Sequence, residues 1–172
     1  MALIVEDGAG LQDSDSFISL SGARAMAANY GYTLPADDSA AEVSLRQGAI
    51  YVDLSEPSFT GERLNEGQGL SWPRSGAYRC RNGNDIAISS DEIPKEAKYA
   101  QVVAASIYGS GDNPRGNYTG RITTAEKVGP IEVEYSDSSA TGETFVITSA
   151  NDALKPLKCA NSNTLTMRTL RV

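Results

Sequence analysis

The residues best suited to chemistry lie between positions 69 and 83, in the stretch GLSWPRSGAYRCRNG. It holds the only tryptophan of the chain, Trp72, which is followed by Arg74, Arg79 and Arg81. Proteins hold single-stranded nucleic acid by stacking bases on aromatic rings and binding phosphates with cations, so this stretch is a candidate nucleic-acid site. However, such sites usually interleave several aromatic rings, and a large aromatic side chain contributes most of its energy through burial. We therefore favour the alternative that Trp72 anchors the loop, while the arginines contact acidic residues of the same chain or of a neighbouring subunit.

A second candidate is the pair Glu132 and Glu134, which lie two positions apart in the alternating stretch IEVEY. On a strand both carboxylates share one face, and two such groups can serve as acid and base. Alternating glutamates are, however, the usual solvent face of an antiparallel strand. No nucleophile or metal triad accompanies them, and the Gly-rich stretch GSGDNPRGNYTG lacks the order GxxxxGK[ST] of a phosphate-binding loop. We predict no catalytic role for this pair.

The sequence also lacks residue types on which common enzyme sites depend. It contains no histidine, and its two cysteines, Cys80 and Cys159, are far apart and show no CxxC spacing. Histidine is the commonest metal ligand and the usual acid or base at neutral pH, so Ser-His-Asp catalysis and zinc chemistry are excluded. We expect a protein that is not an enzyme and that uses no metal or other cofactor.

Charge is distributed unevenly along the 172 residues, whose net charge is −7. Residues 1–60 carry nine acidic and two basic side chains, whereas 61–83 carry four arginines against two glutamates. The last eighteen residues, 155–172, carry four basic side chains and no acidic one. An acidic body with a basic loop and a basic tail is a poor match for a protein whose main task is to coat a phosphate backbone.

The length is that of one domain, and no run of about 18 apolar residues predicts a membrane span. The opening MALIVEDG lacks the basic start and long apolar stretch of a secretory signal, so we expect the protein in the cytosol.

Apolar residues at helical spacing predict three main helices. The first spans about 20–30, with Ser19 or Ser21 as its N-cap and Gly31 as its C-terminal stop. The second spans about 39–55, where the order S-A-A-E at 39–42 is a capping box and Pro57 bounds the far end.

A third helix spans about 94–108, with Pro94 in its first turn. The core is expected to include Val43, Ile50, Leu54, Ala100, Val103 and Ile107. The fold class is therefore predicted to be mainly α, a small helical bundle with loop insertions at 61–93 and 109–120.

A β element is predicted at 121–148, where residues alternate across a Gly-Pro break at 129–130 and form a pair of strands. The stretch 144–148 could add to it before a short helix that Pro156 limits. We assign residues 1–157 to one domain and 158–172 to an extended C-terminal tail.

Five stretches in order along the chain, MALIVEDGAG, DSFISLSGARA, LSWPRSG, DEIPKEAKYAQ and EKVGPIEVEY, resemble a family of tailed-phage proteins labelled DnaT-like single-stranded DNA-binding proteins. The resemblance runs from residue 1 to about 157. Sequences of this family in turn resemble the head-to-tail adaptors, or connectors, of the phage neck.

The resemblance implies a ring, commonly of twelve copies, that lies below the portal protein, extends the channel for double-stranded genomic DNA and docks the next neck or tail protein. It implies a place in the virion, after assembly in the cytoplasm of the bacterial host. In such a ring, Glu132 and Glu134 would face the channel and keep the passing duplex from adhering. The acidic first third would contact the arginine-bearing loop 61–83 of the adjacent copy. The family label itself implies the alternative, a single-stranded DNA-binding protein of phage replication.

The basic tail is predicted to become ordered on a partner, because it has little apolar surface of its own to bury. Residues 165–170 alternate between two sides of an extended chain, so the tail could pair with the edge of a partner's sheet. The alternative is a strand that folds back on its own domain. We assign the contact with the portal protein or an adjacent subunit to Lys158, Leu165, Met167, Arg168, Leu170 and Arg171.

Overall fold

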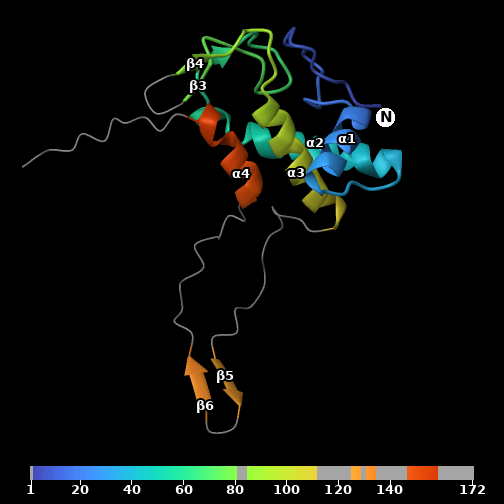
Figure 1. The fold of residues 1–172 in the computed structure, drawn as a ribbon, viewed down its shortest axis with the longest axis vertical. Coiled ribbons are helices and arrows are strands. Elements are labelled where there is room, and N and C mark those ends of the chain that lie inside the picture. Colours follow the sequence, from blue (N-terminus) through green and yellow to red (C-terminus); the bar gives the residue numbers. More distant parts are fainter. Residues whose placement is uncertain (1, 81–84, 112–124, 129–130, 135–146, 159–172) are drawn as a thin grey trace, which may run out of the picture.

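The computed structural model describes residues 2–80, 85–111, 125–128, 131–134 and 147–158 (Figure 1). It is mainly α, as predicted, and of the predicted C-terminal tail, 158–172, only Lys158 is among the described residues. The four helices are α1 (Leu20–Tyr30), α2 (Asp38–Asp53), α3 (Lys95–Gly109) and α4 (Thr148–Leu154). Two short 3-10 turns, η1 (Glu56–Ser58) and η2 (Lys155–Leu157), follow α2 and α4.

Three two-stranded antiparallel sheets complete the described part of the chain. They are β1 (Glu62–Arg63) with β2 (Arg74–Ser75), β3 (Tyr78–Arg79) with β4 (Ile86–Ala87), and β5 (Ala125–Val128) with β6 (Ile131–Glu134). The predicted strand pair at 121–135 is confirmed, and its register places Glu132 opposite Lys127 and Glu134 opposite Ala125. The first four strands lie within the predicted insertion at 61–93, whereas most of 109–120 lies outside the described residues.

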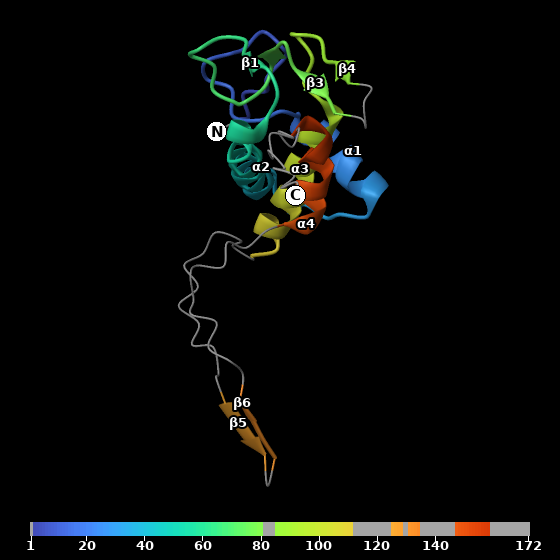
Figure 2. The same ribbon diagram turned by 90° about the vertical axis from the view of Figure 1, so that its left-hand side faces the viewer.

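Helix α3 is the centre of the bundle, because α1, α2 and α4 all pack against it (Figures 1 and 2). Small residues make this possible, since Ala97, Ala100 and Ala104 are fully buried along α3. The approach of α2 is closest at Gly48, where a Cβ atom would lie 2.4 Å from the carbonyl oxygen of Gln101. A side chain at position 48 would therefore push the two helices apart.

The helix ends agree with the sequence to within a few residues. Ser19 caps α1 by accepting a hydrogen bond from Gly22, and Gly31 ends it at a φ of 75°. The predicted capping box of α2 is wrong, because Asp37 caps this helix and accepts from the backbone of Ala40 at 2.9 Å. Hydrogen bonding from Ser39 lowers the pKa of Asp37, so the carboxylate is charged at the positive end of the helix dipole.

The core prediction is right for α3 and wrong for α2. Ala100 and Val103 are fully buried, and Ile107 packs against the core. Val43, Ile50 and Leu54 are 55%, 44% and 54% exposed, although they were predicted to be buried. The reason is that α2 has apolar residues on two opposite sides, and only the side with Leu45, Ala49 and Val52 faces the bundle.

The N-terminal segment is tied to the bundle by buried polar groups. The carboxylate of Glu6 is 3% exposed and accepts hydrogen bonds from the backbones of Gly8, Gly10 and Leu11, and from the Ser14 hydroxyl. The Glu6 carboxylate therefore provides the hydrogen-bond acceptors for the backbone of residues 8–11, which a helix or a sheet would otherwise provide.

Gln101 of α3 makes the corresponding connection farther along the segment. Its side chain is fully buried, accepts from the backbone N–H of Phe17 at 3.0 Å, and donates to Ser16 Oγ and to the carbonyl of Leu45. One amide thus joins the N-terminal segment, α2 and α3.

The C-terminal part of the described chain differs slightly from the prediction. Thr148 begins α4 instead of ending a strand, and the remainder of the predicted strand at 144–146 lies outside the described residues. Pro156 lies in η2, as expected for a residue that limits a helix. Cys80 is disulfide-bonded, a feature that the spacing of the cysteines does not predict. No helix in the described ranges has the length and hydropathy that a membrane span requires.

Candidate functional site

Trp72 lies inside the protein, between β1 and β2. Its side chain is 0% exposed and packs against Phe59, with 5.6 Å between ring centroids, while the guanidinium of Arg74 lies 6.0 Å from the indole centroid. A fully buried ring cannot stack on a nucleobase. The burial of Trp72 supports the loop-anchor interpretation, which the Trp72 variants described in the Discussion test.

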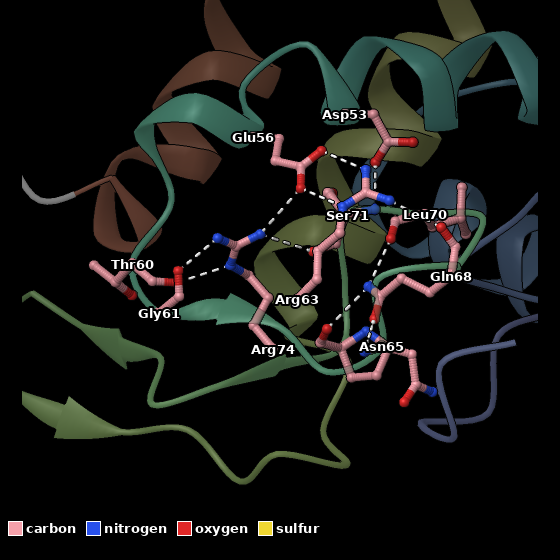
Figure 3. A network of polar contacts seen from close by, with 11 residues as sticks. Asp53, Glu56, Thr60, Gly61, Arg63, Asn65, Gln68, Leu70, Ser71 and Arg74 are labelled. Atoms are coloured by element: carbon pink, nitrogen blue, oxygen red, sulfur yellow. Dashed lines mark hydrogen bonds and ion pairs between the residues drawn. The ribbon is translucent and has the colours of Figure 1, made fainter. Parts of the chain in front are cut away.

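Arg74 is also internal, at 6% exposure (Figure 3). It donates to the carbonyls of Thr60 at 2.8 Å and Gly61 at 2.6 Å, and its Nη1 lies 3.3 Å from Glu56. Burial lowers the pKa of Arg74 below its ordinary value, and the Glu56 carboxylate opposes this shift. Arg74 therefore crosslinks its own loop and offers little to a phosphate.

Glu56 connects the two halves of this network (Figure 3). Its carboxylate binds Arg63 through two contacts of 2.5 and 2.6 Å, in addition to the contact with Arg74. Hydrogen bonding from Arg63 lowers the pKa of Glu56 from its ordinary value of 4.5, whereas burial raises the pKa of nearby Asp53. Asp53 accepts from the backbone of Ser71 at 2.9 Å, which fixes the start of the Trp72 loop.

The predicted pH dependence of stability follows from Glu56. Because its pKa is lower in the folded state, its contribution is present above pH 4.5 and is lost as the pH falls through the lower folded value. Glu56→Gln should lower the free energy of unfolding at pH 7 by about 1.5 to 3 kcal/mol, the range for hydrogen bonds to charged groups. Urea unfolding at pH 7 and pH 3 measures this, and the gap between wild type and variant should narrow at pH 3. An equal gap at both pH values would contradict the assignment.

Arg79, like Arg63 and Arg74, pairs with carboxylates of its own chain. It contacts Glu92 at 2.6 Å and Glu96 at 3.0 Å, and therefore joins β3 to the start of α3. Every arginine in the described ranges pairs with a carboxylate of the same chain, since Arg24 contacts Asp38 and Arg46 contacts Asp15. The predicted contact of this loop with a neighbouring subunit stays a prediction, and Arg81 lies outside the described residues.

An exposed aromatic and basic cluster lies elsewhere, where the end of α1 meets the start of α3. Tyr30 is 48% exposed, and its ring lies 4.8 Å from that of Tyr99 in an edge arrangement. The hydroxyls of Tyr32 and Tyr99 lie 3.2 Å apart, and the ammonium of Lys95 lies 6.0 Å from the Tyr30 ring centroid. Lys98, half-buried, follows in the same turn of α3. We call these five residues the tyrosine–lysine cluster.

The sequence does not predict the tyrosine–lysine cluster, because Tyr30 and Lys95 are about 65 residues apart along the chain. The local signals were Tyr30-Gly31-Tyr32, in which the left-handed glycine turns the chain after α1, and a lysine at position 95, four residues before Tyr99. Neither signal predicts the other, since only the packing of α1 on α3 brings them together.

A second exposed feature runs along the solvent side of α2. Ala40, Val43, Gln47, Ile50 and Leu54 are all exposed and are spaced alternately three and four residues apart, the spacing of a helix-docking seam. We call these five residues the α2 outer face. Its apolar content is unusual for a surface that meets only water.

The remaining predicted residues are placed only in part. Glu132 and Glu134 lie in β6. Lys158 is half-buried and donates to Asn151 at 2.7 Å, and its burial lowers its pKa. The other predicted portal contacts, Leu165, Met167, Arg168, Leu170 and Arg171, lie outside the described residues.

Comparison with known proteins gives one match. The family model described as "Putative DnaT-like ssDNA binding protein" matches residues 1–172, so it extends beyond the expected limit near 157 and includes the basic tail. No curated protein and no solved structure matches the chain. Because this match spans the whole sequence, the protein belongs to the family of DnaT-like single-stranded DNA-binding proteins.

Proposed function

We propose that the protein binds single-stranded DNA through the tyrosine–lysine cluster. The observation that carries the proposal is the half-exposed ring of Tyr30 with the Lys95 ammonium 6.0 Å from its centroid, an aromatic platform beside a cation. The description of the family supports the same activity. Neither lysine of the cluster forms an ion pair with the described residues, so both are free to meet phosphates.

The residues of the tyrosine–lysine cluster have different roles in this proposal. A base stacks on the outer face of Tyr30, whose inner side is supported by the edge of Tyr99. Hydrogen bonding with Tyr32 raises the pKa of Tyr99 to about 12, so the phenol stays neutral beside a phosphate. Stacking and charge recognise every base equally, so we expect binding with little sequence preference.

The test is a fluorescence-anisotropy titration of a labelled oligothymidine. Tyr30→Ala should weaken binding about 5- to 150-fold, the range for one lost stacking contact. The double variant Lys95→Glu, Lys98→Glu should weaken it further. The wild-type slope of log K against log salt should be near −1.4, the value for two phosphate contacts on a single strand.

The control is Lys155→Glu, a single reversal of the same kind at an exposed lysine in η2. It should bind nearly as well as wild type. If the wild type shows no salt-dependent binding, or if Tyr30→Ala binds like the wild type, the site is not the tyrosine–lysine cluster.

A second candidate function is the head-to-tail adaptor of a tailed phage, a ring of about twelve copies with the portal protein above and a neck or tail protein below. The observation that favours it is that all five described arginines are paired within the chain, which leaves an acidic body. Such a surface suits a channel wall to which double-stranded DNA must not adhere. The family description supports single-stranded DNA binding more directly than this role.

Native mass spectrometry of the protein alone and with portal protein separates the two candidates. An adaptor should give a closed ring that remains with the portal and binds no oligothymidine. A DNA-binding protein should bind the oligonucleotide with no need of a ring. The adaptor role would place the protein in the virion neck, and a purified virion that lacks it would exclude that role.

A further inference from the structure

The α2 outer face has no partner among the described residues, although it carries three large apolar side chains at 44% to 55% exposure. Leaving such side chains in water forgoes the stabilisation that burial supplies. We propose that residues 159–172 of the same chain fold back along the α2 outer face and cover it. The proposal concerns a contact within one chain and does not depend on DNA binding or on ring formation.

The point where the described chain ends supports this occupant. The carbonyl of Leu157 accepts from the backbone N–H of Thr60 at 3.2 Å, and the carbonyl of Pro156 accepts from Cys80 at 2.8 Å. Thr60 follows Leu54, the last residue of the α2 outer face, by only six positions. The C-terminal segment therefore leaves the body close to the C-terminal end of α2.

The segment is also long enough. The α2 outer face extends from Ala40 to Leu54, about 21 Å along the helix axis. Residues 159–172 number 14 and reach about 46 Å when extended, so they can span the face and still include a turn at the point of departure.

The order of charged and apolar residues in the segment 159–172 also matches their order along α2. A segment that starts at the C-terminal end of α2 brings its last residues to the N-terminal end. There Arg168 and Arg171 come near the carboxylates of Asp37 and Glu42, and the segment itself carries no acidic residue. The segment also carries apolar residues before and between these arginines and at its end, and these can cover the exposed apolar side chains of α2. They are Leu165, Met167, Leu170 and Val172.

The test is photo-crosslinking in the full-length protein with p-benzoylphenylalanine in place of Gln47, the central residue of the α2 outer face. After irradiation, reduction and trypsin digestion, the crosslinked peptide should be 159–168. In a mixture of ¹⁴N- and ¹⁵N-labelled protein, the crosslinks should join chains of one isotope only. The same photo-reactive residue in place of Asn29, which is exposed on α1, is the control and should not crosslink to this peptide.

Two further variants sharpen the outcome. Ile50→Asp with Leu54→Asp should reduce the crosslink about tenfold or more, because two apolar contacts are lost at positions whose exposure keeps the fold intact. Arg168→Glu with Arg171→Glu should reduce it more at low salt than at high salt. Absence of the 159–168 crosslink, or crosslinks between the two isotopes, would overturn the proposal, and the second result would identify another copy as the occupant.

Discussion

Replacing Trp72 with alanine should lower the free energy of unfolding by about 3 to 5 kcal/mol, the range for truncating a large buried aromatic side chain. The indole is fully buried, packs on Phe59 and lies beside the Arg74 guanidinium, so its removal leaves a cavity under a loop that has little regular structure. Urea unfolding followed by circular dichroism measures the loss. Tyr30→Ala is the matched control, since that aromatic ring is half-exposed and its loss should cost much less.

Trp72→Phe should be far milder than Trp72→Ala. Trp72 Nε1 has no hydrogen-bond partner in the described structure, so phenylalanine removes a buried unsatisfied donor while it keeps most of the apolar volume. The Phe variant should also bind oligothymidine as the wild type does, because the buried ring takes no part in stacking. A Trp72→Ala variant that is fully stable yet no longer binds DNA would show that the ring is exposed in the active protein.

Replacing Gln101 with methionine should lower the free energy of unfolding by about 2 to 5 kcal/mol. The methionine has a similar volume but leaves the Phe17 N–H without its acceptor and removes the amide donor to Ser16 Oγ and to the Leu45 carbonyl. A buried group left unsatisfied costs about 1 to 3 kcal/mol. The same urea unfolding experiment measures the change. Hydrogen exchange of the Phe17 amide should also become faster, because its N–H loses its acceptor.

The control for this prediction is Gln12→Met, the same substitution at an exposed position of the N-terminal segment. It should change stability by no more than about 0.5 kcal/mol. Equal effects at both positions would mean that the hydrogen bonds of Gln101 contribute little, and that the N-terminal segment is held by its apolar contacts instead.

The helices could be predicted because their signals are local. Ser19 and Gly31 mark the ends of α1, and the buried alanines of α3 repeat at helical spacing. The capping residue of α2 was misjudged because Asp37 and Ser39 are both good N-caps, and the carboxylate of Asp37 accepts the hydrogen bonds of both Ser39 and Ala40. The local sequence cannot show which of two N-cap candidates, two positions apart, begins the helix.

The burial of α2 could not be predicted for a different reason. Apolar residues occur on both sides of this helix, and only the position of α3 decides that Leu45 is buried and Ile50 is exposed. The same limit applies to the candidate site, since Tyr30 and Lys95 become neighbours only through tertiary packing. The charge of Arg74 likewise does not predict that its side chain points inward. It points inward because it donates hydrogen bonds to two backbone carbonyls of its own loop.

The central position of α3 has a consequence for synthesis on the ribosome. The N-terminal segment and the first two helices are made early, yet the residue that joins Phe17 to α2 is Gln101, 84 positions later. At about 5 to 20 residues per second, the growing chain waits roughly 4 to 17 s before this partner is even made. During that interval the alanine-rich sides of α1 and α2 lack α3, against which both helices pack in the folded protein. The nascent chain therefore exposes apolar helix surface to water until α3 emerges.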